Sequence, residues 1–180
     1  MNGLGVGGVN WVFPWASITR EIAGSRLHIA CLSSSWLACS EDDRGKLALG
    51  LAQVNPVLDG ADQADIVIAA MHHPWDWMAE WDRASKTELQ RTADLVLRGH
   101  LHDASLLDVR AFGRAQSVEI AAGASYETSE VALGYQWIEL RPLDRSVRVV
   151  PRAWSLQRRD WSADLNRYQA RHVDIALPVR

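Results

Sequence analysis

The stretch Ile66-Val67-Ile68-Ala69-Ala70-Met71-His72-His73-Pro74 decides how this chain folds, because an unbroken apolar run ends abruptly in two histidines. A second stretch, Leu95-Val96-Leu97-Arg98-Gly99-His100-Leu101-His102, repeats this arrangement further along the chain. Short apolar runs of this kind are typical of strands buried in a parallel sheet. Since parallel strands deliver their carboxyl ends to one edge of a sheet, we expect the histidines to lie together there.

The sequence around these stretches alternates between expected helices and strands. Three helices are expected, at residues 17–23 closed by Gly24, at 47–58 bent by Pro56, and at 85–93, where Ser85 and Glu88 have the spacing of a capping box. Three strands are expected, at residues 27–32, 66–71 and 95–98. From residue 27 onward this order is β-α-β-α-β, which predicts parallel pairing of the three strands.

Beyond His102 the expected strands follow one another more closely. They cover residues 106–112, 117–122, 135–140 and 147–154, with turn signals between them. Close spacing favours antiparallel pairing. Residues 155–180 are polar with isolated aromatics, and we interpret them as a tail that wraps the surface of a domain spanning residues 1–154.

Composition limits the class of protein. At 180 residues and 48% hydrophobic, the chain is long and apolar enough for one globular core. A net charge of −3 gives no basic excess for binding nucleic acid, and no stretch has the length and apolarity of a membrane span or a signal peptide. We therefore expect a cytoplasmic protein that does not bind membrane and has no clear nucleic-acid binding surface. Cys31 and Cys39 are interpreted as free thiols.

The clustered histidines predict a metal site. Neutral imidazole binds Zn, Mn, Fe and similar ions, and two histidines at positions i and i+2 of a turn can both face one ion. We expect Gly99 to let the backbone turn sharply just before His100. A single His-x-His is often just a polar loop, but a second pair of histidines at a neighbouring strand end makes metal binding the better interpretation.

The order of these motifs resembles the second half of the calcineurin-like metallophosphoesterases. The resemblance rests on two motifs in order and covers roughly residues 10–154. One strand runs into His72-His73-Pro74, a helix follows, and the next strand ends in Gly99-His100-Leu101-His102. The resemblance implies an α/β fold, a four-layer α/β/β/α sandwich with mixed sheets, and two divalent ions (Mn, Fe or Zn) at the strand ends. It also implies that His72 and His100 bind one ion and that His102 binds the other. His73 either points away from the ion or meets the substrate phosphate as a catalytic residue.

The sequence also departs from that family. An Asp-x-His, a Gly-Asp whose aspartate bridges the ions, and a Gly-Asn-His-Asp/Glu are all missing before His72. The one histidine in that region, His28, lies in the middle of an expected strand, and we interpret it as a core or sheet-face histidine. Three histidines without a bridging carboxylate could hold one ion weakly, but they could not hold two, because nothing would offset the repulsion between the ions. We therefore expect the carboxyl-terminal portion of such a domain, with the other half lost to a late start site or supplied by another chain.

Two functions follow as hypotheses. The first is a metal-dependent hydrolase of phosphoester bonds, weak or inactive in this chain alone, whose partners are a phosphoester substrate and either a second copy of the chain or the missing amino-terminal half. The second is a catalytically inactive phosphoesterase-like module for protein interaction, which exposed tryptophans would favour. The chain has nine tryptophans. Trp75, Trp77 and Trp81 flank the histidines, and we expect them to pack rather than to bind substrate.

Overall fold

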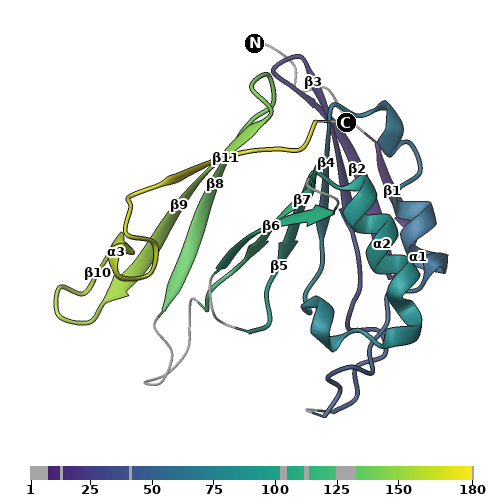
Figure 1. Cartoon of the computed structure of the whole chain (residues 1–180), viewed down its shortest axis with the longest axis horizontal. Coiled ribbons are helices and arrows are strands. Elements are labelled where there is room, and N and C mark those ends of the chain that lie inside the picture. The colour runs from purple at the N-terminus through teal and green to yellow at the C-terminus, as the bar shows by residue number, and fades with distance from the viewer. Residues whose placement is uncertain are drawn as a thin grey trace.

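The computed structural model describes residues 8–12, 14–40, 42–101, 105–111, 114–124 and 133–179, and its strands form two sheets (Figure 1). The larger sheet has the strand order β1-β2-β3-β4-β5-β7-β6, and in the smaller sheet β9 pairs with β8, β10 and β11. The strands are β1 (Val9–Val12), β2 (Trp15–Ile22), β3 (Ser25–Cys31), β4 (Ile66–Ala70), β5 (Leu95–Arg98), β6 (Ser105–Ala111), β7 (Arg114–Ala121), β8 (Gly134–Arg141), β9 (Ser146–Ser155), β10 (Asp160–Ala163) and β11 (Val173–Ala176). The helices are α1 (Leu51–Val57), α2 (Arg83–Thr92) and α3 (Leu165–Tyr168), with short 3₁₀ turns at Ala61–Gln63, Trp75–Trp77 and Glu80–Asp82.

The predicted β-α-β-α-β unit is present as β3-α1-β4-α2-β5. Strands β3 and β4 pair in parallel, as do β4 and β5. Strand β7 then adds to β5 in parallel, while β1, β2 and β6 join by antiparallel pairing. The sheet is therefore mixed, and the predicted α/β class is confirmed.

Two apolar clusters hold the layers together. Helices α1 and α2 cover one face of the larger sheet, where Val54 and Leu89 pack against strand residues such as Val67 (Figure 1). On the other face, strand residues including Ile66 pack against Val149 of the smaller sheet. Burying one such aliphatic side chain contributes about 1.5–3 kcal/mol. The result is a helix–sheet–sheet sandwich, and α3 is the one helix beside the smaller sheet in the part of the chain that is described.

The helix expected at residues 17–23 is wrong, because these residues belong to strand β2. Ile22 and Ser25 face each other across a hairpin whose two loop residues, Ala23 and Gly24, have φ values of 51° and 78°. Positive φ at both loop positions is the type I′ geometry that matches the twist of paired strands. Gly24 therefore closes a hairpin rather than a helix.

The other two helices differ from the prediction at their amino-terminal ends. Helix α1 begins at Leu51 rather than Leu47, and Pro56 lies inside it. Helix α2 begins at Arg83, so Ser85 lies within the helix instead of capping it. The Ser85 hydroxyl donates a hydrogen bond to Asp82 (2.6 Å), whose carboxylate also accepts from the backbone N–H of Leu49 (2.6 Å). The contact between Asp82 and Leu49 joins distant parts of the chain, and spacing alone does not reveal it.

The carboxyl-terminal residues add two strands to the smaller sheet. Strand β10 pairs with one half of β9 and β11 pairs with the other half, both antiparallel. Leu177 is buried in the cluster between the two sheets. Cys31 and Cys39 are free thiols, and Cys39 is exposed. No described helix is long and apolar enough to cross a membrane.

Candidate metal centre

The paired strands β4 and β5 bring two histidine motifs together. Ala70 lies opposite Leu97, and the backbone contact continues past the strand ends, where the N–H of Gly99 donates to the carbonyl of His72 (3.1 Å). His72 and His100 each lie two residues beyond the end of their strand. The carboxyl edge of the parallel sheet therefore places the two histidines side by side, as the sequence predicts.

The distance between His72 and His100 fits a shared ion. His72 Nε2 and His100 Nδ1 lie 3.2 Å apart. Two nitrogens bound to one tetrahedral ion at about 2.0–2.1 Å are roughly 3.3 Å apart, which is close to the separation of these two nitrogens. Together with His73, they form a cluster whose potential ligand atoms all lie within 4.8 Å of one another.

The backbone turns sharply at His100 itself. His100 has φ 74°, in the left-handed region, whereas Gly99 is not among the glycines with positive φ. Histidine tolerates this region better than most residues, although it is uncommon there. A Cβ at position 99 would lie 3.6 Å from Nδ1 of His72, an ordinary contact. The expectation that Gly99 provides the turn is therefore wrong, and the unusual conformation belongs to the candidate ligand.

Ser34 fixes the orientation of the histidine pair His72-His73. Its Oγ accepts hydrogen bonds from the backbone N–H groups of His72 (3.1 Å) and His73 (2.9 Å), and it lies 3.0 Å from His73 Nδ1. A hydroxyl has two acceptor lone pairs and one proton. Because both lone pairs are used, Ser34 donates its proton to His73 Nδ1, which leaves the ring hydrogen of neutral His73 on Nε2.

His73 is therefore different in kind from its two neighbours. It is buried, and burial first, followed by the charges of His100 and His72, lowers its pKa from 6.5 to about 4. The indole of Trp77 stacks on the His73 ring with centroids 5.5 Å apart and meets the edge of His100 at 4.1 Å. The cluster thus offers two rings that can share an ion, plus one neutral N–H donor held against a tryptophan.

Carboxylates near the cluster are engaged elsewhere. Asp76 forms an ion pair with Arg44. Asp43 accepts backbone hydrogen bonds from Ser40 (2.9 Å) and Cys39 (2.6 Å), which lower its pKa to about 2. In the part of the chain that is described, the cluster consists of histidines alone. His102, the third predicted ligand, lies outside the described residues.

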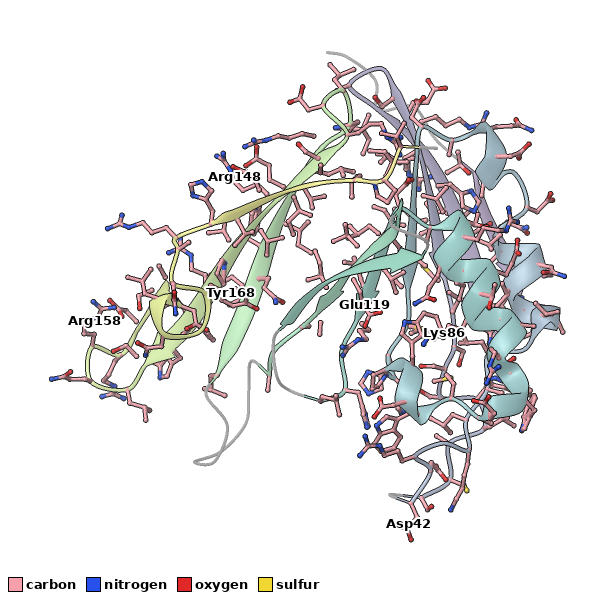
Figure 2. All side chains as sticks on the ribbon, viewed as in Figure 1. Asp42, Lys86, Glu119, Arg148, Arg158 and Tyr168 are labelled. Carbon is pink, nitrogen blue, oxygen red and sulfur yellow. The ribbon has the colours of Figure 1, made fainter. Side chains whose placement is uncertain are left out.

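A buried ion pair supports the strand that leads to His100. The guanidinium of Arg98 pairs with Glu119 of β7, and their side chains are only 8% and 3% exposed. The indole N–H of Trp75 donates to the same carboxylate (2.7 Å), while Lys86 of α2 lies over the Trp75 ring; Figure 2 labels Lys86 and Glu119. Of the three tryptophans near the histidines, Trp75 packs as expected, whereas Trp81 is 72% exposed.

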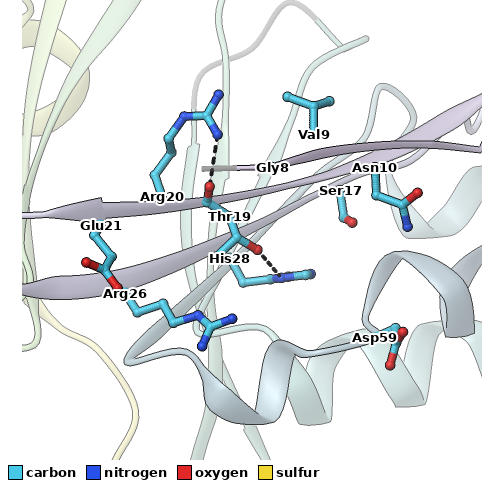
Figure 3. Close-up of a pocket in the computed structure, with 10 residues that line it drawn as sticks. All are labelled: Gly8, Val9, Asn10, Ser17, Thr19, Arg20, Glu21, Arg26, His28 and Asp59. Atoms are coloured by element: carbon cyan, nitrogen blue, oxygen red, sulfur yellow. Dashed lines mark hydrogen bonds between the residues drawn. The ribbon is translucent and has the colours of Figure 1, made fainter. Parts of the chain in front are cut away.

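His28 lies apart from this centre, in a polar pocket of about 680 Å³ between β1–β3 and the loop after α1 (Figure 3). Its Nε2 donates to the carbonyl of Val57 (2.6 Å), and its Nδ1 lies 3.4 Å from the hydroxyl of Thr19. Since both ring nitrogens have partners and the side chain is buried, its interpretation as a core histidine is confirmed.

Comparison with known proteins gives distant matches among solved structures, while no protein-family model and no curated protein matches the chain. Wild-type Vps29 from Entamoeba histolytica complexed with Zn²⁺ is 8% identical with a TM-score of 0.37, and the match covers 88% of this chain and 59% of that one. A hypothetical protein from Thermus thermophilus is 14% identical (TM-score 0.43; 94% and 66% covered). A predicted phosphoesterase from Streptococcus pneumoniae is 12% identical (TM-score 0.35; 82% and 95% covered). The chain thus spans 59% of the length of the Entamoeba Vps29 structure that it matches.

Proposed function

We propose that this chain is the metal-binding, carboxyl-terminal portion of a metal-dependent hydrolase of phosphoester bonds, a metallophosphoesterase. The observation that carries the proposal is the 3.2 Å separation of His72 Nε2 and His100 Nδ1 at the carboxyl edge of β4 and β5. Two neutral imidazoles at this spacing suit a divalent transition ion such as Mn, Fe or Zn. In this proposal His72 and His100 hold one ion, and His102 belongs to a second.

The residues around the ligands have distinct tasks in the proposed reaction. A bound ion would supply Lewis acidity and lower the pKa of a bound water. His73 presents an Nε2–H, fixed by the contact between Ser34 and Nδ1 (3.0 Å), and this group donates a hydrogen bond to a phosphoryl oxygen. Trp77, stacked on His73, keeps that ring from rotating away. His73 is thus the proposed catalytic residue, and Ser34 and Trp77 position it.

Full activity in this proposal needs carboxylates from beyond the histidine cluster. Two ions a few ångströms apart repel each other strongly unless an anionic ligand lies between them. The described cluster contains only imidazoles. We therefore propose that further ligands come from sequence upstream or from another chain, and that this chain by itself turns over phosphoesters barely above background.

Metal binding tests the proposal directly. We expect the purified chain to retain a divalent transition ion after dialysis, as measured by elemental analysis. The variant His72→Ala/His100→Ala should lose the ion, while His172→Ala, which removes an exposed histidine beside the smaller sheet, should keep it. Equal metal content in all three proteins, with unchanged circular dichroism, would reject the site.

A measurement of activity tests the proposal that this chain lacks some of the metal ligands. With added Mn, hydrolysis of a chromogenic phosphodiester should stay close to background. Robust turnover that disappears in His100→Ala would support the hydrolase but show that the remaining ligands lie within this chain. Turnover that survives the substitution would reject this centre as its source.

The second candidate function is a catalytically inactive interaction module. Its support is the exposure of three tryptophans, Trp36, Trp81 and Trp137, at 50%, 72% and 67%. Exposed indoles are enriched at protein interfaces. Loss of metal binding together with a stable, cooperatively folding monomer would favour this function over the hydrolase.

A further inference from the structure

A groove of about 680 Å³ lies on the smaller sheet, away from the histidine cluster. Its walls come from β8, β9, β10 and the residues after α3. On β9 the side chains alternate, so Val147 and Val149 face the core between the sheets while Arg148, Val150 and Arg152 line the groove. Figure 2 shows Arg148 on β9 and Arg158 in the turn between β9 and β10, both far from helices α1 and α2. The groove therefore lies on the outer face of the sandwich.

The groove carries a local excess of positive charge in a chain whose net charge is −3. Four arginines line it against two carboxylates, Glu139 and Asp160. Arg148 is occupied by a two-pronged ion pair with Asp174 (2.8 and 3.0 Å), and Arg158 pairs with Asp160 (3.2 Å). In the described part of the chain, the side chains of Arg152 and Arg171 have no hydrogen-bond or ion-pair partner. Two guanidinium groups in one groove are thus free to bind an anion.

An aromatic ring stands beside these free arginines. Trp161 lines the groove and is 37% exposed. Edge contacts with Tyr135 (4.9 Å) and Trp154 (5.4 Å) hold its ring in place. Trp161 pairs with Trp154 across the strands, and Arg152 is two residues from Trp154 on the same face of β9. Trp161 and Arg152 are therefore diagonal neighbours, with Cα atoms roughly 7–8 Å apart.

We propose that this groove binds a mononucleotide, with the base on Trp161 and the phosphate on Arg152 and Arg171. A planar guanidinium binds phosphate oxygens in pairs, and an indole stacks on any base. A volume of about 680 Å³ lies within the roughly 300–1,000 Å³ range of small-ligand pockets. The site is separate from the proposed hydrolase centre.

The carboxylates on this face argue against a nucleic-acid chain as the ligand. A single strand needs a continuous basic path along its backbone. Here Glu139 and Asp174 both lie opposite Arg148, and Asp160 pairs with Arg158, so such a path is interrupted. A mononucleotide needs no such path, because its one phosphate requires only Arg152 and Arg171.

Calorimetric titration with adenosine monophosphate, adenosine and inorganic phosphate tests the proposal. We expect saturable binding of the nucleotide, with adenosine and phosphate each roughly tenfold weaker, since each makes only half of the contacts. Arg152→Gln/Arg171→Gln should weaken nucleotide binding at least tenfold, about 1.4 kcal/mol. The matched control, Arg83→Gln/Arg91→Gln, removes the same charge from α2 and should bind normally.

Four results would overturn the proposal. The first is no saturable nucleotide binding at millimolar concentration. The second is binding that His72→Ala/His100→Ala abolishes and the groove variant does not, which would place the nucleotide at the histidine centre. The third is phosphate binding as tight as nucleotide binding, unaffected by Trp161→Leu, which would make the groove a plain anion site. A change of oligomeric state in the groove variant, measured by sedimentation, would instead identify an interface between copies and also overturn the proposal.

Discussion

The carboxyl edge of β4 and β5 and the outer face of the smaller sheet both gather polar side chains, but they hold them differently. At the strand ends, Ser34 and His73 are only 1% and 5% exposed, and hydrogen bonds fix both. On the outer face, Arg158 and Asp160 form an ion pair with side chains 59% and 54% exposed. Water competes little with the first set and strongly with the second. The first region is therefore preorganised, whereas the second can rearrange around a ligand.

The largest expected effect compares a buried ion pair with an exposed one. Glu119→Gln leaves the Arg98 guanidinium buried without its counter-charge, and we expect a loss of about 3–5 kcal/mol in the free energy of unfolding. Asp174→Asn, which removes the exposed partner of Arg148, should have no measurable effect on stability. Urea denaturation measures both. Equal losses would break the comparison between the two regions.

A smaller effect is expected from removing one hydroxyl. Ser34→Ala leaves the backbone N–H groups of His72 and His73 without their acceptor, and we expect a loss of about 1–3 kcal/mol in unfolding free energy. The control Ser162→Ala, on half-buried strand β10, should change stability by less than about 0.5 kcal/mol. A Ser34 variant as stable as the control would mean that these N–H groups find other partners.

The pH dependence of stability should report on His73. Its folded pKa of about 4 lies below the ordinary value of 6.5, so the unfolded chain binds more protons between these values. The contribution of His73 to the free energy of unfolding is therefore complete above about pH 6.5 and falls as the pH drops toward about 4. Below about pH 4 His73 causes no further change. In metal-free buffer, His73→Gln should flatten this part of the curve. An unchanged slope would assign the pH dependence to other groups.

The smallest effect should come from the outer face. Trp137 is 67% exposed on β8, so Trp137→Ser should change the free energy of unfolding by no more than about 0.5 kcal/mol. Trp75→Ser removes a packed indole and its hydrogen bond to Glu119, and it should lower the free energy of unfolding clearly more than Trp137→Ser does. Thermal unfolding of the two variants side by side sharpens the contrast. A large loss in Trp137→Ser would show that the outer face contributes to the core.

The sequence pattern predicts that a helix or strand exists better than it predicts the residues at which the element begins and ends. The apolar runs that lead into His72 and His100 identified β4 and β5, and their order identified parallel pairing. Gly24 differs from the expectation because a glycine after a helix and one in a hairpin turn look alike, and Ser85 differs because it donates to Asp82, three residues earlier, instead of capping the helix. The hairpin depends on the pairing of β2 with β3, and Asp82 is held by the backbone of Leu49, so spacing along the chain contains neither piece of information.

The sequence by itself determined that this is an α/β chain with histidines delivered to one edge of a parallel sheet, because side-chain periodicity and strand order act locally along the chain. Only the tertiary structure decided what each side chain at that edge of the sheet contacts. Ser34 lies far from His73 in sequence, yet it sets the proton position on that ring, and Arg152 becomes a neighbour of Trp161 only through the pairing of β9 with β10. Contacts of this kind depend on chain segments meeting in three dimensions at hydrogen-bond distances, which no one-dimensional pattern specifies.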